Sequence, residues 1–224
     1  MRDAPLPTVG ILGGTGPLGR GLALRLALAG YEVVLGSRKT ERAVGVADGL
    51  RDDHGVGVDV LWGAANHEAA ARDVVIVAVP FDGVRPLLEP IGDLLADTVV
   101  ISCVNRLGFD GDGPHPLPVE EGSAAELIAR LVPRAQVAAA FHHVPAGRLT
   151  RDTGPLDMDV LIAGDDGLPH VRELVEAIDG VRAVSAGPLR LSRPLEELTA
   201  VVIAVNKHYK VTAGVRLTGL PDTA

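Results

Sequence analysis

A glycine-rich segment near the start of the chain places the strongest limit on its fold. The stretch GGTGPLG (13–19) follows an apolar run, TVGIL (8–12). It leads into a segment in which Leu18, Leu22 and Leu26 recur at the spacing of one helix face. A strand, a glycine turn and a helix in this order are typical of a βαβ unit, in which the helix packs on a parallel sheet.

Short β-branched runs alternate with helical patterns along the rest of the chain. Further strands are expected at 31–36, 58–63, 73–80, 98–105, 136–144, 158–164 and 181–187. Helices are expected at about 40–52, over 83–95 with a proline interruption, from 123, from about 168 and over 192–208, with an edge strand at GVRLTG (214–219). The alternation predicts an α/β fold, a doubly wound and mostly parallel Rossmann sheet with a small C-terminal helical extension.

Two local features interrupt this pattern. The segment 106–122 has no periodicity and is rich in proline and glycine, so we expect a long loop there. SAAE (123–126) then opens a helix as a capping box, with Ser123 as the cap and Glu126 reaching back.

Composition agrees with a buried parallel sheet. Hydrophobic residues make up 47% of the 224 residues and aromatic residues only 3%, so the core must be built from Ala, Val, Leu and Ile. A chain of this length holds one well-buried domain with an appendage.

Charge and cysteine content exclude several classes of partner. The formal net charge is −8 and there is no basic run, which argues against nucleic acid and anionic membranes. Cys103 is the single cysteine and lies in an apolar run, so we expect a buried, inert thiol, no internal disulfide and no cysteine-based metal site. No metal-binding residues are expected elsewhere in the chain. With no basic and hydrophobic leader and no apolar run of about 18 residues, the expected location is the cytoplasm.

The glycine spacing indicates a dinucleotide site. Gly14, Gly16 and Gly19 have the G-x-G-x-x-G spacing, in which the first glycine makes the turn. The second lets the backbone approach a pyrophosphate, and the third lets the helix pack closely. The helix N-terminus adds amide donors and a partial positive charge.

The end of the second expected strand selects the nucleotide. An NAD site places an acidic residue there to bind the ribose 2′-hydroxyl, but this chain reads GSRKTER (36–42). Ser37 can donate a hydrogen bond and Arg38 offers a planar fork of donors, with Arg42 one helical turn further on and Lys39 adding charge. The pattern favours NADP over NAD.

At this point the chain resembles the NADPH:F420 oxidoreductase family. The resemblance begins with GGTGPLGRGLALRLALAG and LGSR and continues through AVP (78–80), FHHVPA (141–146), AGPLRLSRPLEELT (186–199) and GVRLTGL (214–220). It implies hydride transfer between the nicotinamide of NADPH and the deazaflavin coenzyme F420, usually in a homodimer. The implied domains are an NADP-binding Rossmann domain (1–187) and a C-terminal helix and edge strand (188–224) that completes the acceptor site and the dimer interface.

The resemblance also implies the residues of the site. Thr15, Gly16, Pro17 and Leu18 would hold the pyrophosphate, and Ser37, Arg38 and Arg42 the 2′-phosphate. Val79, Pro80 and Phe81 would line the adenosine and nicotinamide side, with Asn105 and Ala146 near the nicotinamide.

The acceptor side is expected to be sparse. Direct hydride transfer needs aligned rings and little acid or base assistance, so no catalytic triad is expected. His142 and His143, at a strand end, are candidate acceptor contacts, of which strand alternation would let one face the ligand. Candidate cations for the anionic F420 tail are Arg148, Arg151, Lys207, His208 and Lys210. The segment 106–121 and the second histidine depart from archaeal members of the family.

Other functions remain open at this stage. The chain could be a non-enzymatic NADPH-binding sensor, or a reductase of another flavin-like acceptor. A short-chain dehydrogenase needs a Tyr followed four residues later by Lys, whereas Tyr31 and Tyr209 are followed at that distance by Leu35 and Ala213. The expected partners are therefore small-molecule cofactors.

Overall fold

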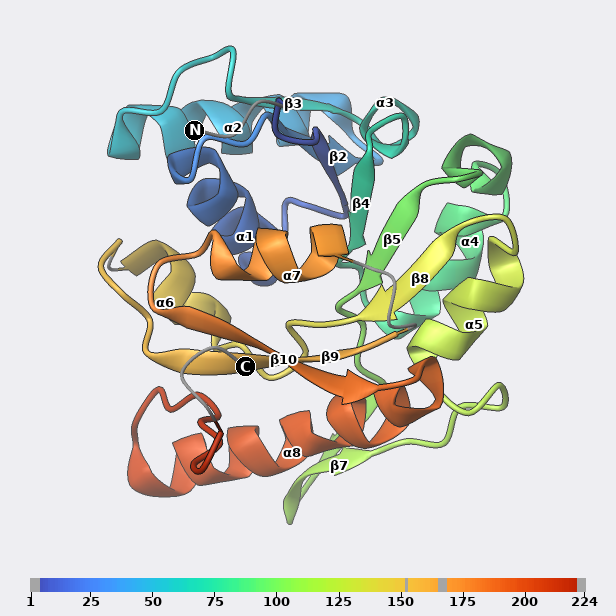
Figure 1. Ribbon diagram of the computed structural model, residues 1–224, viewed down its shortest axis with the longest axis vertical. Helices are drawn as coiled ribbons and strands as arrows, with labels where there is room; N and C mark the ends of the chain where they lie inside the picture. Colours follow the sequence, from blue (N-terminus) through green and yellow to red (C-terminus); the bar gives the residue numbers. More distant parts are fainter. Residues whose placement is uncertain (1–4, 152, 165–168, 221–224) are drawn as a thin grey trace.

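The computed structural model describes residues 5–151, 153–164 and 169–220 (Figure 1). The strands are β1 (Val9–Leu12), β2 (Val33–Ser37), β3 (Leu61–Ala65), β4 (Val74–Val77), β5 (Val99–Ser102), β6 (Leu107–Asp110), β7 (Gly113–Pro116), β8 (Gln136–Ala139), β9 (Met158–Ala163) and β10 (Val181–Gly187). The α-helices are α1 (Pro17–Leu28), α2 (Thr40–His54), α3 (Asn66–Ala70), α4 (Val84–Leu88), α5 (Ala124–Leu131), α6 (Ala146–Arg151), α7 (Pro169–Glu176) and α8 (Ser192–Tyr209). Short 3₁₀ turns lie at Phe81–Gly83, Gly92–Leu95 and Leu189–Leu191.

The main sheet has the order β10-β9-β8-β5-β4-β1-β2-β3. Every neighbouring pair is parallel except β8 and β9, which are antiparallel. This confirms the predicted mostly parallel, doubly wound sheet. The carboxyl ends of β1 to β5 and of β8 therefore meet at one edge, where ligands bind in open α/β sheets.

Because β8 and β9 are antiparallel and overlap only at their ends, β9 and β10 lie beyond the carboxyl edge of the other strands. β8 and β9 pair only at Ala139 and Ala163, near the carboxyl end of each strand. β9 therefore begins beyond the end of β8. Figure 1 shows β9 and β10 lying between the elements of the upper half and α8 below.

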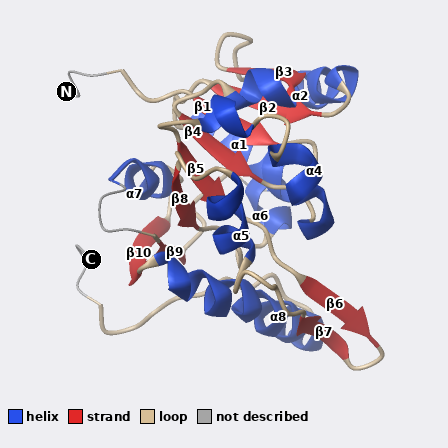
Figure 2. Ribbon diagram, turned by 90° about the vertical axis from the view of Figure 1, so that its right-hand side faces the viewer, coloured by secondary structure: helices blue, strands red, loops and turns tan. Residues whose placement is uncertain are grey.

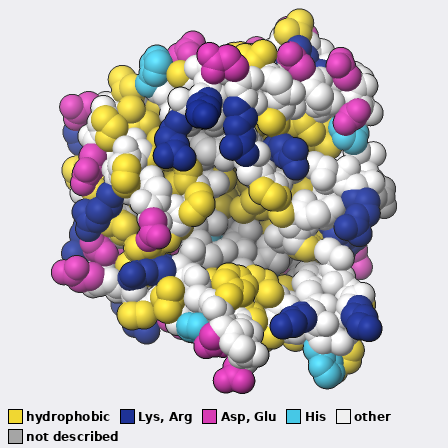
Figure 3. Space-filling view, turned by 180° about the vertical axis from the view of Figure 1, so that it is seen from behind, with side chains coloured by type: hydrophobic (Ala, Val, Ile, Leu, Met, Phe, Trp, Pro, Cys, Tyr) yellow, Lys and Arg dark blue, Asp and Glu magenta, His cyan; other side chains and the backbone are white. Residues whose placement is uncertain are grey.

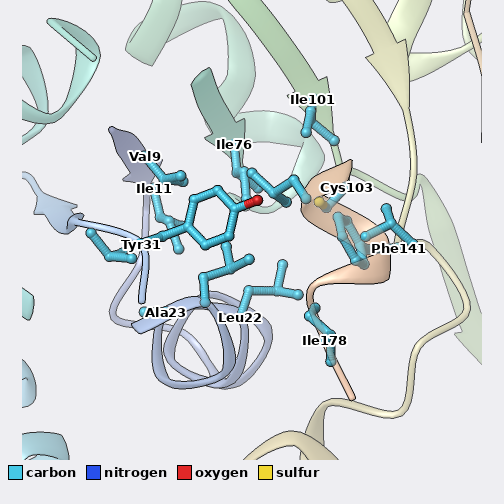
Figure 4. Close-up of a cluster of buried hydrophobic side chains, with 14 of the residues drawn as sticks. Val9, Ile11, Leu22, Ala23, Tyr31, Ile76, Ile101, Cys103, Phe141 and Ile178 are labelled. Atoms are coloured by element: carbon cyan, nitrogen blue, oxygen red, sulfur yellow. The ribbon is translucent and has the colours of Figure 1, made fainter. Parts of the chain in front are cut away.

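Strand alternation divides the core between the two faces of the sheet. On one face Val33, Leu35 and Ile76 pack with α1 and α7, and on the other Val34 and Val75 pack with α3, α4 and α5. Figure 4 shows part of the first cluster, with the buried ring of Tyr31 and with Cys103 beside Phe141. Burial raises the pKa of the Cys103 thiol well above its ordinary value, as expected for an inert thiol.

The segment 106–122 differs from the loop predicted for it. β6 and β7 form an antiparallel hairpin that projects beside α8 (Figure 2). Its turn is built by Asp110, whose Oδ1 accepts hydrogen bonds from the backbone N–H groups of Asp112 at 2.9 Å and Gly113 at 3.1 Å. Two strands of four residues are too short to show a clear period, so turn chemistry was the available signal.

Two other predictions of secondary structure need comment. The proline-interrupted helix expected over 83–95 does break, after Leu88 and before Pro90, and the chain resumes as a 3₁₀ turn and not as α-helix. The expected edge strand over 214–219 does not form in the described residues. The segment keeps one backbone hydrogen bond to β9, from Asp159 N to Val215 O at 2.8 Å. Beyond it, polar side chains bind the backbone: Asp159 Oδ2 accepts from Leu217 N at 2.6 Å, and Arg182 donates to Leu217 O at 2.7 Å.

The helix α8 is joined to α5 through a buried carboxylate. Glu196, 4% exposed, accepts hydrogen bonds from Ala124 N at 2.9 Å and Ala125 N at 3.1 Å. Beside it, the Ser123 and Ser192 hydroxyls are 2.6 Å apart. Ser123 caps α5 as predicted, accepting from Glu126 N at 3.0 Å, while its hydroxyl donates to the Glu126 carboxylate. Two helices distant in sequence thus share one capping site.

The Glu196 carboxyl makes stability depend on pH. Burial is the largest cause that raises its pKa from 4.5 to about 7 in the folded chain. Between these values the folded state holds a proton that the unfolded state has lost, so this group's contribution to stability declines as pH rises. We expect the free energy of unfolding of the wild type, relative to E196Q, to fall on the order of 3 kcal/mol from pH 4.5 to 8. Denaturant unfolding of both proteins across this range measures it, and parallel pH dependence would contradict the assignment.

Candidate functional site

The glycine loop after β1 is shaped by close backbone contacts. Gly13 has φ +72° and is the left-handed residue of the turn, and a Cβ added to Gly14 would lie 2.9 Å from Ile11 O. Gly14 N donates to Gly36 O at 3.0 Å, which ties the loop to β2. A Cβ added to Gly19 would lie 2.6 Å from Gly14 Cα, so the predicted close packing of α1 requires glycine there.

The start of α1 is open toward the carboxyl edge of the sheet. Gly16 is the N-cap and has no side-chain cap, and Pro17 follows. A Cβ on Gly16 would have Gly13 O, at 3.8 Å, as its one protein neighbour within 4 Å. Thr15 and Leu18 are half-buried and Pro17 is exposed. An uncapped helix N-terminus with free space before it fits a pyrophosphate.

The end of β2 presents a hydroxyl and two guanidinium groups. Ser37 is 8% exposed, and its Oγ accepts from Lys39 N at 3.1 Å, which leaves the hydroxyl proton for a ligand. Arg38 and Arg42 are exposed and form no salt bridge with a carboxylate in the described part of the chain. Other arginines do have carboxylate partners: Arg51, Arg85, Arg134, Arg172, Arg182, Arg193 and Arg216.

The segment after β4 packs on the glycine loop. A Cβ on Gly13 would lie 2.3 Å from Val79 Cγ1, so Val79 lies directly against the turn. Pro80 is exposed, and the ring of half-buried Phe81 has the Arg106 guanidinium 4.6 Å from its centroid. The predicted AVP segment therefore joins the nucleotide loop to the base of the β6–β7 hairpin.

Asn105 lies where three parts of the chain meet. Its Nδ2 donates to His142 O at 3.1 Å, and its Oδ1 accepts from the Thr199 hydroxyl at 3.3 Å. The ends of β5 and β8 and the helix α8 are thus held together at one side chain. Thr199 was missed by the sequence analysis because it is a single hydroxyl in an amphipathic helix.

Ala146 begins α6, which is fixed to α1. Arg25 of α1 donates to Leu149 O at 2.9 Å, Thr153 O at 2.9 Å and Gly154 O at 2.8 Å. A Cβ on Gly21 would lie 2.4 Å from Leu149 Cβ, so the two helices are in close contact. The segment predicted to lie near the nicotinamide is therefore held by the helix predicted to hold the pyrophosphate.

The two histidines are not arranged as strand alternation predicted. β8 ends at Ala139, and Phe141 has φ +64°, so His142 and His143 lie in a turn. Both are buried, at 3% and 2% exposure. His143 Nε2 is 3.0 Å from Asp159 O, whereas neither ring nitrogen of His142 has a hydrogen-bond partner among the described residues.

Both imidazoles are neutral near pH 7. Burial is the main cause that lowers the pKa of His142, to about 3, with the neighbouring His143 adding to it. Burial also lowers the pKa of His143. The pair therefore provides hydrogen-bonding groups without a charge, in agreement with a site that needs little acid or base chemistry.

The surface seen from behind has a hollow near its centre (Figure 3). Lys and Arg side chains gather along its upper rim, over the half of the molecule that holds α1, α2 and β1 to β3. The exposed cations of that half include Arg38, Lys39 and Arg42. This arrangement gives an acidic chain a local cationic surface.

The cations predicted for an anionic tail lie on two helices. Arg148 and Arg151 are on α6, and Lys207, His208 and Lys210 are exposed around the C-terminal end of α8. A separate depression at the base of the hairpin is lined by Arg106, Leu117, Val119, Gly122, Arg193, Glu196 and Glu197. Its two arginines were not among the predicted tail contacts, because their proximity depends on the hairpin.

Two classes of feature are absent from the described residues. These ranges contain no group of three or more His, Cys, Asp or Glu side chains placed to hold a metal ion. None of their helices combines the length and apolar character needed to cross a membrane.

Comparison with known proteins places this geometry in a family. Residues 8–106 match the family model described as NADP oxidoreductase coenzyme F420-dependent. The chain is 39% identical to the F420-dependent NADP reductase of Methanothermobacter thermautotrophicus, covering 96% of both chains. It is 35% identical to the reductase of the same name from Methanocaldococcus jannaschii, covering 95% of this chain and 98% of the relative.

A solved structure agrees with the fold. A crystal structure from Arthrobacter sp. FB24, provisionally described as an F420-dependent NADP-reductase, superposes with a TM-score of 0.79 at 23% identity. The match covers 95% of this chain and 99% of the other. The similarity to the archaeal reductases extends over nearly the whole chain and agrees with the glycine loop and the arginines after β2. We conclude that the chain belongs to the family of F420-dependent NADP oxidoreductases.

Proposed function

We propose that this chain transfers a hydride between NADPH and coenzyme F420. The observation that carries the proposal is the 39% identity to an F420-dependent NADP reductase over 96% of each chain. Because the match includes the C-terminal part as well as the nucleotide-binding part, it extends to the whole molecule. When bound, NADPH supplies the hydride and the deazaflavin ring of F420 accepts it.

The nucleotide half is proposed to bind NADPH through amides and cations. Gly14 through Leu18 surround the pyrophosphate, and Ser37, Arg38 and Arg42 bind the 2′-phosphate. The free hydroxyl proton of Ser37 and the absence of carboxylate partners for both arginines within the described ranges support this assignment.

The acceptor half is proposed to orient the rings rather than to move protons. Asn105 and Ala146 lie near the nicotinamide in this proposal, supported by the contacts that hold both in place. The ring nitrogens of buried His142 form no hydrogen bond of good geometry among the described residues, although the Val104 backbone interacts with the ring, and this supports a role toward the acceptor. Alignment supplies most of the rate enhancement when a hydride passes directly between two rings.

A turnover assay tests the activity. Purified protein mixed with NADPH and F420 should bleach the deazaflavin absorbance, and NADP⁺ with reduced F420 should restore it. FMN in place of F420 is the comparison for a reductase of another flavin-like acceptor. NADPH binding without turnover of either acceptor would favour a sensor, and turnover of FMN alone would reject F420 as the acceptor.

The 2′-phosphate assignment predicts a selective effect of R38A. Losing charge-assisted hydrogen bonds to the phosphate should raise KM for NADPH about ten-fold or more, since each contributes roughly 1.5–3 kcal/mol. KM for NADH should change little, because NADH lacks the phosphate. R130A removes an exposed arginine of α5 and is the matched control. Equal effects of R38A on both nucleotides would contradict the assignment.

We further propose that the chain forms a homodimer through α8. Its proposed location is the cytoplasm, as predicted from the sequence. Val201, Val205 and Tyr209 recur at intervals of four residues along this helix and are 57%, 40% and 67% exposed. The helix has no buried residue after Ala200, so this apolar stripe lies on the part of α8 that is least covered by the rest of the chain, as expected for a face that a partner covers. We propose that a second copy of the chain covers this face, because the family resemblance implies a homodimer.

A charge within this stripe should separate the protomers. V205D would bury an unpaired carboxylate in the interface, so its molar mass by light scattering should fall from dimer to monomer. V58D introduces the same charge at a valine that is 65% exposed in the loop before β3, and should leave the mass unchanged. A V205D protein that keeps the wild-type mass would rule out this interface.

A further inference from the structure

Asn66 lies at the junction of the two parts of the nucleotide site, although sequence analysis did not select it. It is the first residue of α3 and directly follows Ala65, the last residue of β3. Ala65 is paired in register with Ser37. Asn66 therefore sits next to the strand end that carries Ser37 and Arg38.

The Asn66 side chain also contacts the glycine loop. Its Oδ1 accepts a long hydrogen bond from Gly13 N at 3.4 Å. Since the donor is a backbone N–H, the oxygen of the amide must face it, which fixes how the amide is turned. Gly13 is the left-handed residue of the loop, at φ +72°, so Asn66 binds the peptide on which the turn depends.

Gly36 of β2 leaves space for the Asn66 side chain, because it has no side chain of its own. A Cβ on Gly36 would lie 2.8 Å from Asn66 Oδ1 and 3.1 Å from Ile11 O. Gly36 O in turn accepts from Gly14 N at 3.0 Å. The Asn66 amide, the end of β2 and the glycine loop thus form one connected group of contacts.

The amide nitrogen of Asn66 takes no part in these contacts. Oδ1 faces Gly13, and Nδ2 carries two N–H donors that have no partner among the hydrogen bonds of the described residues. Asn66 is only half-buried, so these donors can meet a ligand. A neutral donor between a pyrophosphate loop and two arginines suits phosphate or ribose oxygens, whereas a carboxylate there would repel them.

We propose that Asn66 is a positioning and specificity-determining residue of the nucleotide site: Oδ1 holds the Gly13 turn, and Nδ2 donates to the phosphate-bearing ribose of NADPH. The inference rests on the proposed function only in that NADPH is the nucleotide. It requires no statement about the acceptor, so it can be tested by binding alone.

Two variants separate the two halves of the proposal. N66D keeps an acceptor for Gly13 N, removes the Nδ2 donors and adds a negative charge beside the phosphate. Its Kd for NADPH should rise about ten-fold more than its Kd for NADH, because both nucleotides share the repulsion at the pyrophosphate but only NADPH also loses a charge-assisted contact worth roughly a factor of ten. N66A removes the contact to Gly13 as well and should weaken both nucleotides.

The experiment is titration calorimetry of wild type, N66D and N66A with NADPH and NADH, accompanied by thermal unfolding of each protein. H67A alters the exposed next residue of α3 and should leave both Kd values unchanged. A merely structural role would lower the unfolding temperature without changing the ratio of the two Kd values. That ratio, measured on folded N66D, is therefore the decisive readout.

The results that would overturn the proposal are distinct from failure of the proposed function. If wild type binds NADPH and both variants keep its Kd within two-fold, Asn66 has neither role. If N66D weakens the binding of both nucleotides equally, Asn66 does not donate to the phosphate-bearing ribose. If wild type binds neither nucleotide, both the proposed function and this inference fail, whereas binding without F420 turnover leaves the inference standing.

Discussion

The close approach of α1 to the glycine loop is the contact on which the rest of the structure depends. At Gly19 a Cβ would lie 2.6 Å from Gly14 Cα, so even one methyl group would push the helix away. This contact sets the helix N-terminus over the carboxyl edge of the sheet, with its amides directed at that edge. The remaining parts of the site are arranged around this end: Val79 packs on Gly13, and Gly36 accepts from Gly14.

The nucleotide half could be predicted because its signals are local. The glycine spacing, the leucine stripe of α1 and the polar residues after β2 lie within about thirty residues, the extent of one βαβ unit. Within that unit the order of elements in the sequence determines their order in space, since right-handed crossovers leave few alternatives. The observed β3-β2-β1-β4 arrangement agrees with the predicted doubly wound sheet.

The acceptor half could be predicted only in part, because it is built from long-range contacts. Asn105 is joined to Thr199 across ninety-four positions, and Ala124 to Glu196 across seventy-two. The same limitation explains His142 and His143, where alternation failed because the chain leaves the strand at Ala139. It also explains the segment over 214–219, which has one backbone hydrogen bond to β9 and is otherwise bound by the side chains of Asp159 and Arg182.

The buried side chain of Arg25 connects the nucleotide half of the molecule to the proposed acceptor half. Its guanidinium is 3% exposed and donates to carbonyls at the end of α6 and the turn after it, so a permanent charge is buried against backbone dipoles. Burying a cation is tolerated only when hydrogen bonds replace its hydration, and the carbonyls at a helix C-terminus are free to do this. α1 begins at the proposed pyrophosphate site and α6 at the residue proposed beside the nicotinamide. In this proposal a rigid connection between their far ends fixes the spacing between the pyrophosphate and the nicotinamide of bound NADPH, and direct hydride transfer depends on that spacing because ring alignment is its main requirement.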